Sequence, residues 1–120
     1  DLNNKIEEKI IQNGFIPITT KSISEKFNLP ERECLELLHV LKNEEKIIKV
    51  DSNFWLHFEI KDKLYLFNKK HFESNDELNI SDFKSYTGLT RKYAIPMLEF
   101  CDQQGWTSRR GDTRIKGQKL

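Results

Sequence analysis

Two basic residues stand where a helix normally avoids positive charge. Thr90 is a good N-cap residue, and Arg91 and Lys92 follow it into the first turn of a predicted helix. A helix N-terminus already carries about half a positive charge, so two cations there are unfavourable in the free protein. A bound phosphate would reverse this, because it pairs with both cations and accepts hydrogen bonds from free backbone N–H groups. This stretch therefore predicts an anion-binding site.

A second basic group lies further along the chain, at Arg109, Arg110 and Arg114. Residues 80–120 contain 8 Lys or Arg and 4 Asp or Glu, a net charge of +4, whereas residues 1–79 carry a net charge of −3. The overall net charge of +1 hides this asymmetry. We therefore expect the anionic partner at the C-terminal end of the chain.

The apolar periodicity predicts the elements that position these residues. In the first half we expect a helix, a short extended piece, two helices and a β-hairpin, at residues 2–13, 15–19, 22–27, 31–43 and 46–56. Gly14 would end the first helix, Ser22 would cap the second, and Pro30 suits the start of the third.

The same pattern recurs after a shift of 60 residues. Leu38 falls on Leu98, and the hairpin at 46–56 falls on 106–116, where Gly111 and Asp112 form a natural two-residue turn. The pattern of each copy predicts a helix-turn-helix followed by a hairpin wing. The predicted fold is therefore α+β and mostly helical, with two tandem winged-helix units.

The predicted units span residues 1–57 and 58–120, and their surfaces differ. The third helix begins with Pro30-Glu31-Arg32-Glu33 in the first copy and with Thr90-Arg91-Lys92-Tyr93 in the second. A shared core cannot explain this difference in charge. We therefore expect the second unit to bind the anion and the first unit to act as a spacer.

The two wings differ in the same way. Arg109-Arg110 replaces Lys49-Val50, and the direct 60-residue shift places Arg114 at the position of Phe54. The start of the third helix and the wing flank one face of a winged-helix unit. The two basic groups are therefore expected to share an edge.

Composition excludes several classes of protein. Hydrophobic residues make up 37% of the chain and charged residues 32%, and no apolar run reaches the length of a membrane span. There is no signal-peptide pattern, and the first residue, Asp1, suggests a fragment of a longer protein. Cys34 and Cys101 are expected to be buried free thiols in a reducing compartment. The three histidines are scattered, so no metal site is expected.

The third helix of the second unit favours RNA over DNA. After its first turn it offers mainly apolar residues, interrupted by Pro96, and we expect Glu99 and Asp102 to be exposed and to repel phosphates. A DNA reader needs polar side chains along this helix to reach base edges. Proteins usually read RNA at loops and bulges, which a basic tip and wing would suit.

Two other functions remain open at this point. A DNA-binding winged-helix regulator would dimerise and bind duplex DNA, whereas a protein-interaction module would expose an apolar patch beyond the needs of the core. We see no such patch in the sequence. No set of nucleophile, base and orienting group supports an enzyme.

Residues 80–115, ISDFKSYTGLTRKYAIPMLEFCDQQGWTSRRGDTRI, closely resemble the C-terminal winged-helix domain of the bacterial selenocysteine-specific elongation factor family, SelB. The resemblance is carried by residues 88–99, with a proline inside the helix, and by residues 105–114. Trp106 and Ser108 depart from the family pattern, which puts one phosphate contact at Ser108 in doubt. Residues 1–79 resemble the preceding winged-helix unit in pattern only.

The resemblance implies a module that recognises an mRNA hairpin, the selenocysteine insertion element (SECIS). The full-length factor would deliver selenocysteinyl-tRNA to the ribosome at UGA codons in the cytoplasm. The resemblance implies that its GTPase, with GTP and Mg²⁺, lies upstream, and no phosphate-binding GxxxxGK[ST] loop occurs in these 120 residues. The chain itself is expected to be a monomer without catalytic activity, cofactor or membrane contact.

The resemblance also implies roles for individual residues. Thr90, Arg91 and Lys92 would hold phosphates at the hairpin tip, and the wing would clamp the other strand. Glycines would allow close approach of the backbone, Tyr93 would either stack on a base or join the core, and Lys84 could reach a flanking phosphate. The expected RNA-binding set is Lys84, Gly88, Thr90, Arg91, Lys92, Tyr93, Arg109, Arg110, Gly111 and Arg114.

Overall fold

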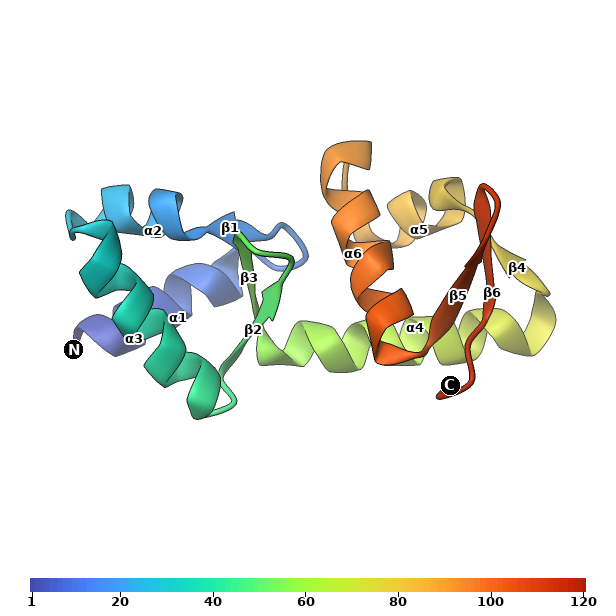
Figure 1. Ribbon diagram of the computed structural model, residues 1–120, viewed down its shortest axis with the longest axis horizontal. Coiled ribbons are helices and arrows are strands. Elements are labelled where there is room, and N and C mark those ends of the chain that lie inside the picture. The colour runs from blue at the N-terminus through green and yellow to red at the C-terminus, as the bar shows by residue number, and fades with distance from the viewer. The chain divides into compact units, whose positions relative to one another are not determined.

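The computed structural model describes residues 1–120 and divides into two compact units, Asp1–Ile60 and Lys61–Leu120. Each unit combines helices with a small three-stranded antiparallel sheet (Figure 1). The predicted boundary lay at residues 57 and 58, where the last strand of the first unit meets the next helix. The winged-helix fold expected from the repeat is confirmed.

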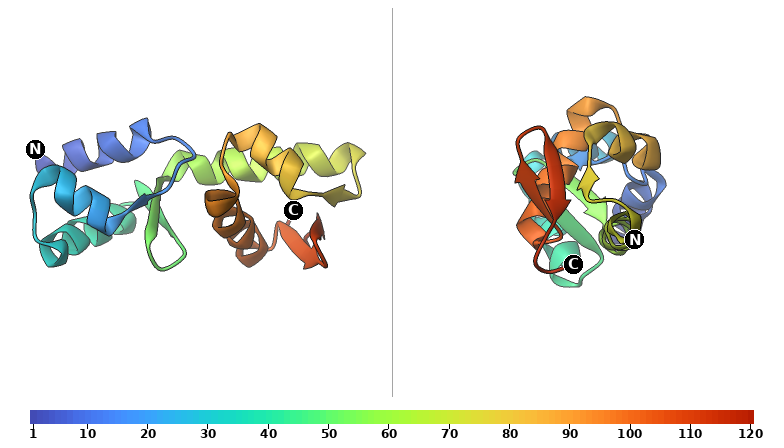
Figure 2. Two further views of the ribbon diagram at one scale, coloured as in Figure 1. Left: turned by 90° about the horizontal axis from the view of Figure 1, so that it is seen from above. Right: turned by 90° about the vertical axis from the view of Figure 1, so that its right-hand side faces the viewer.

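The first unit contains three helices and three strands. They are α1 (Leu2–Gln12), β1 (Ile18–Thr19), α2 (Thr20–Phe27), α3 (Glu31–Asn43), β2 (Ile47–Val50) and β3 (Phe54–His57). The helices pack together and the sheet, in the order β1-β3-β2, covers one end of the group (Figure 2). The core comprises Ile6, Ile10, Ile18, Ile23, Cys34, Leu38, Leu41, Ile47 and Trp55.

The second unit repeats this order. It contains α4 (Phe58–Ser74), which begins just before the boundary, β4 (Glu77–Leu78), α5 (Ile80–Thr87), α6 (Arg91–Gln104), β5 (Thr107–Arg110) and β6 (Thr113–Lys116). Its sheet has the order β4-β6-β5, and β5 and β6 form the wing. Phe83, Ala94, Leu98 and Cys101 are buried at the repeat positions of core residues in the first unit.

Two local predictions are corrected by the structure. The second helix begins at Thr20 and its N-cap is Thr19, whose hydroxyl accepts a hydrogen bond from the Ser22 N–H at 3.0 Å. Ser22 therefore lies inside the helix. The extended piece expected at 15–19 is a strand only at Ile18–Thr19, because only these residues pair with β3.

The wing register corrects a third prediction. Residues 51–53 connect β2 to β3, whereas only Gly111 and Asp112 connect β5 to β6, so the second turn is one residue shorter. Lys49 pairs with Trp55, and Arg109 pairs with Arg114. The structural counterpart of Arg114 is therefore Trp55, not Phe54.

Both cysteines are free and buried, as their apolar helical positions predicted. Burial raises the pKa of the Cys101 thiol to about 12, and burial together with the nearby charge of Glu31 raises the pKa of Cys34. No helix combines the length and apolar character needed to cross a bilayer.

Candidate nucleic-acid interface

The start of α6 and the wing enclose a hollow of about 330 Å³ in the second unit. Arg91 comes from α6, Arg109 from β5 and Arg114 from β6, so members of both basic groups line one hollow, whereas Lys92 and Arg110 do not line it. The complete lining is Ile80, Arg91, Ile95, Arg109, Asp112 and Arg114. The hollow thus has three guanidinium groups, one carboxylate and two aliphatic side chains.

The N-terminus of α6 faces this region without a side-chain cap. Thr90 occupies the N-cap position, but its hydroxyl makes no capping hydrogen bond, in contrast to Thr19 of α2 and Asn79 of α5. The first N–H groups of any helix have no acceptor within that helix. Arg91 and Lys92 are exposed beside them. An incoming anion would find both backbone donors and side-chain cations here.

The wing tip presents further positive charge. Arg109 and Arg110 are exposed, and Arg109 Nε donates a hydrogen bond to the Gly111 carbonyl oxygen at 3.2 Å. Gly111 has a φ of +64°, a left-handed conformation that glycine adopts without strain. The turn alone therefore accounts for this glycine, and the space where a side chain would stand is open.

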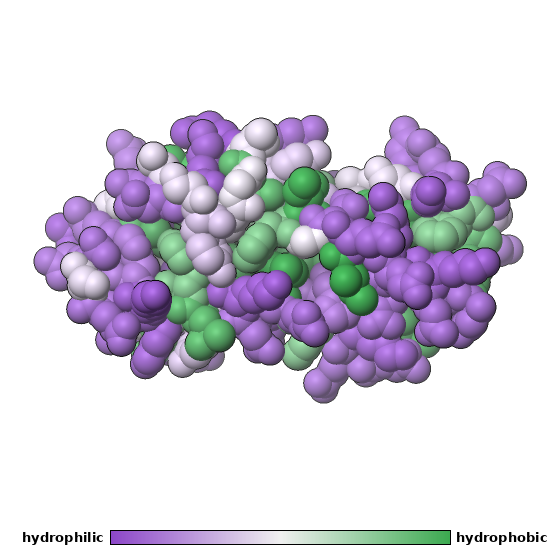
Figure 3. All heavy atoms as spheres, turned by 180° about the vertical axis from the view of Figure 1, so that it is seen from behind, coloured by the Kyte–Doolittle hydropathy of each residue, from purple (hydrophilic) through white to green (hydrophobic).

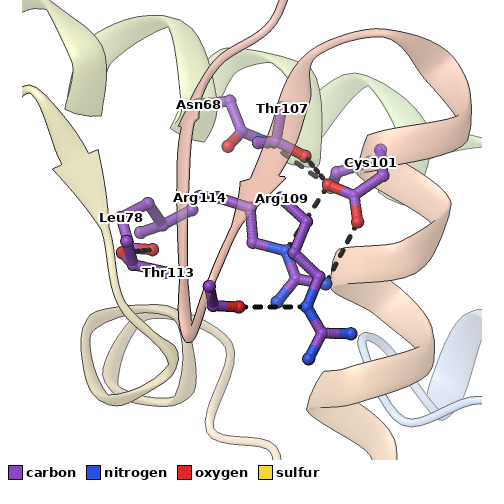
Figure 4. Close-up of polar contacts among 9 residues, drawn as sticks. Asn68, Leu78, Cys101, Thr107, Arg109, Thr113 and Arg114 are labelled. Carbon is purple, nitrogen blue, oxygen red and sulfur yellow. Dashed lines mark hydrogen bonds and ion pairs between the residues drawn. The ribbon is translucent and has the colours of Figure 1, made fainter.

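Arg114 is placed differently from the other basic residues. Its side chain is only 8% exposed, and its Nη2 lies 3.0 Å from Asp102 Oδ2 while Nε donates to Asp102 Oδ1 at 3.4 Å (Figure 4). The Thr107 hydroxyl donates to the same Asp102 Oδ1 at 2.6 Å. This placement differs from the expectation that Arg114 extends from the wing to clamp RNA.

Asp102 was expected to be exposed on α6, and this prediction is wrong. Its carboxylate is 24% exposed and is bound by Arg114 and Thr107. Its charge is neutralised within the protein, so only Glu99 remains as an exposed acid on that stretch of α6. The 60-residue repeat could not identify Asp102 as a partner of the wing, because the counterpart of Asp102 in the first unit, Lys42, has the opposite charge.

The other predicted residues are distributed around the same unit. Lys84 is exposed on α5, and Gly88 is the C-cap of α5 with a φ of +74°. Tyr93 is half-buried, and Lys92 Nζ lies 5.4 Å from the centre of its ring. The hollow is also lined by Ile80, Ile95 and Asp112, which the sequence pattern did not predict as binding residues.

The first unit has a hollow at the corresponding place, with a volume of about 390 Å³. Its lining is Thr19, Thr20, Lys21, Glu31, Asn53 and Phe54. Glu31 stands where the second unit has Arg91, and no arginine lines the hollow. The shape therefore belongs to the fold, whereas the positive charge belongs to the second unit.

A different surface of the second unit is apolar. A hollow of about 490 Å³ on α4 and α5 is lined by Leu66, Phe67, Lys70, His71, Ser74, Asn75 and Tyr86. The Phe67 and Tyr86 rings stack with centroids 4.2 Å apart, and Leu66 is 63% exposed. Apolar side chains also reach the surface between hydrophilic ones in Figure 3. The expectation that the core accounts for every apolar patch is therefore wrong.

Fold and site together define a tandem winged-helix protein with one basic edge. Residues 70–115 match the family model described as "Elongation factor SelB, winged helix". The selenocysteine-specific elongation factor of Desulfomicrobium baculatum is 35% identical over 113 residues, which cover 94% of this chain and 18% of that protein. Residues 70–115, in the second unit, are thus similar to the winged-helix domain of the SelB elongation-factor family.

Solved structures show the same fold. The mRNA-binding domain of elongation factor SelB from E. coli, solved in complex with SECIS RNA, matches with a TM-score of 0.80 and 19% identity over 98% of both chains. A bacterial selenocysteine-specific elongation factor, EF-Sec, matches with a TM-score of 0.75 and 24% identity over 98% of this chain and 18% of that chain. The chain thus spans about a fifth of the full-length relatives.

Proposed function

We propose that the second unit binds an mRNA hairpin of the SECIS type and acts as the recognition module of a selenocysteine-specific elongation factor. The observation that carries this proposal is the hollow that joins Arg91 of α6 to Arg109 of the wing. The E. coli domain of the same fold was solved with SECIS RNA, and the D. baculatum relative is a selenocysteine-specific elongation factor.

The chemistry of the edge suits the phosphate backbone of a protruding loop. Arg91 and Lys92 would neutralise phosphates beside the open N–H groups of α6, and Arg109 and Arg110 would reach the backbone from the wing. Gly111 and Gly88 leave room for close approach of the RNA backbone. Lys84 and Tyr93 would add contacts at the margin, to a flanking phosphate and to a base respectively.

A DNA operator suits this surface less well. In α6, the residues Ala94, Met97, Leu98, Phe100 and Cys101 are buried, so the helix has few side chains left to read base edges. Glu99, the exposed acid, would oppose phosphates in a major groove. The exposed cations lie at the tip of the helix and on the wing, where a loop or bulge is within reach.

The rest of the factor would supply the chemistry. Delivery of selenocysteinyl-tRNA to the ribosome at UGA codons, with GTP and Mg²⁺, is assigned to parts of the full-length protein outside these 120 residues. The present chain would be a cytoplasmic, monomeric binding module without catalysis of its own, and the first unit would act as a spacer. The family match at residues 70–115 supports the assignment of these residues to the winged-helix part of such a factor.

Fluorescence anisotropy tests the proposal directly. The labelled probes are an RNA hairpin with a loop guanine and a bulged uridine, the same hairpin without the bulge, and the matching DNA. We expect tight, bulge-dependent RNA binding that Arg91→Ala weakens about tenfold. The matched control is Lys21→Ala, which removes one cation from the corresponding hollow of the first unit and should leave binding unchanged.

The outcomes separate the candidate functions. Equal affinity for RNA and DNA would reduce the basic edge to a general electrostatic surface and contradict the proposal. Absence of binding to every probe would contradict it as well and would favour a protein-interaction module. Equal effects of Arg91→Ala and Lys21→Ala would place the interface outside the second unit's hollow.

A further inference from the structure

Two positions that are apolar in the core of the first unit are polar in the second. The repeat aligns Ile47 with Thr107, and the wing register aligns Trp55 with Arg114. Ile47 and Trp55 are buried among other apolar side chains, whereas Thr107 and Arg114 are buried polar residues. The wing of the second unit is therefore held to its third helix by a different kind of contact.

One carboxylate makes this contact. Asp102, near the end of α6, accepts hydrogen bonds from Thr107 of β5 and from Arg114 of β6 (Figure 4). The arginine approaches through two nitrogens, a geometry that fixes both the distance and the angle of the guanidinium plane. Each strand of the wing is thus tied to the same point on the helix.

The attachment of the wing to Asp102 also affects the geometry of the hollow. Arg114 pairs with Arg109 across the wing, so an anchored Arg114 also fixes the strand position from which Arg109 extends. Arg91 stands on the helix that carries Asp102. The separation between Arg91 and Arg109 therefore depends on how firmly the wing is attached to α6.

We propose that Asp102 is a positioning residue for RNA binding: it holds Thr107 and Arg114 so that Arg91 and Arg109 face one hollow at a fixed separation. In this arrangement Arg114 acts through Asp102 and is not itself a clamp on the RNA. The inference rests on the proposed RNA-binding function, but its structural part, the attachment of the wing by Asp102, does not.

Because Asp102 is negatively charged, the proposal and simple electrostatics predict opposite changes in RNA affinity when it is neutralised. Asp102→Asn raises the net charge by one unit, and simple attraction to RNA would then tighten binding. Loss of the attachment would instead weaken binding, about fivefold to tenfold, as is typical for groups coupled in one hydrogen-bond network. The matched control is Glu99→Gln, which removes an exposed carboxylate from the same helix and should leave binding equal or slightly tighter.

Two further variants separate geometry from charge. Arg114→Lys keeps the positive charge but cannot make the two-point contact with Asp102, so it should weaken binding about as much as Arg114→Gln does. Thr107→Val replaces the hydroxyl group with a methyl group of similar size, so it should weaken RNA binding less than the Asp102 and Arg114 variants do. It provides a test of the attachment if those charged-residue variants fail to fold. Circular dichroism melting of every variant identifies losses that come from unfolding.

Hydrogen exchange of the wing amides tests the attachment without RNA. Exchange at residues 107–110 and 113–116 should be faster in Asp102→Asn than in the native chain and unchanged in Glu99→Gln. Tighter or equal RNA binding by Asp102→Asn, or unchanged exchange in its wing, would overturn the proposal. If the native chain binds no RNA, the proposed function fails, and the exchange measurement still decides whether Asp102 holds the wing.

Discussion

The two units build a similar hollow at the same place in the fold but give it a different charge. In both, the hollow lies between the start of the third helix and the wing; the charged residues of the first are Glu31 and Lys21, and those of the second are three arginines and Asp112. Glu31 and Glu33 complement the positive N-terminus of α3, whereas Arg91 and Lys92 oppose that of α6. The charges at the start of α3 are favourable in the free protein, whereas those at the start of α6 become favourable only when an anion binds.

The comparison also separates two ways of holding a wing. The first unit uses Trp55, which is fully buried and donates its indole N–H to Thr20 Oγ1 at 2.9 Å. The second unit uses Arg114 at the same register position and pairs it with Asp102. An apolar anchor contributes mainly to stability, whereas a two-point arginine–carboxylate pair also fixes the orientation of the wing relative to the helix.

The largest expected difference is in stability at this shared position. Trp55→Ala should lower the free energy of unfolding of the first unit by about 3–5 kcal/mol, because it leaves a large cavity in the core. Arg114→Ala should lower that of the second unit by about 1–3 kcal/mol, since Asp102 remains partly solvated after losing its partner. Native-state hydrogen exchange measures each unit separately, as the two need not unfold together.

If Arg114→Ala destabilised its unit as much as Trp55→Ala does, the contrast between the two anchors would be wrong. Ser108→Ala, at an exposed position on the same wing, is the control and should leave both exchange profiles unchanged.

The next largest effect is a charge exchange at the helix starts. Arg91→Glu gives the second hollow the residue of the first and should weaken RNA binding about a hundredfold, because a carboxylate would then face the phosphate backbone. Glu31→Arg gives the first hollow the residue of the second and should change RNA affinity by less than about twofold. Anisotropy titrations against the bulged hairpin measure both. A gain of tenfold or more for Glu31→Arg would show that the first unit also contacts RNA and would end its role as a spacer.

The smallest effect concerns the wings. Arg109→Ala should reduce the slope of log affinity against log salt by about 0.7–0.9, the contribution of one phosphate contact. Lys49→Ala, its counterpart, should leave the slope unchanged, since Lys49 Nζ lies 5.7 Å from the centre of the Trp55 ring in its own unit. Titrations at several salt concentrations provide the comparison, and equal slopes for the two variants would remove Arg109 from the interface.

Sequence patterns alone determined most of the architecture. The spacing of apolar residues located the helices, and the 60-residue repeat identified both winged-helix units, because a core position such as Leu38 or Leu98 must be apolar wherever its helix packs. The basic residues Arg91 and Arg109 were also visible, since no core requirement accounts for them. Charge at a helix start is a local property, so it can be recognised without a structure.

Only the tertiary structure decided which charges are available. The turn at Gly111 is one residue shorter than its counterpart, and that single residue moves Arg114 from the position of Phe54 to the position of Trp55. A change of register by one residue turns a strand side chain to the opposite face, and here it turns Arg114 inward to Asp102. Residue type predicts that an arginine carries charge, but strand pairing decides whether that charge meets a partner in the protein or one outside it.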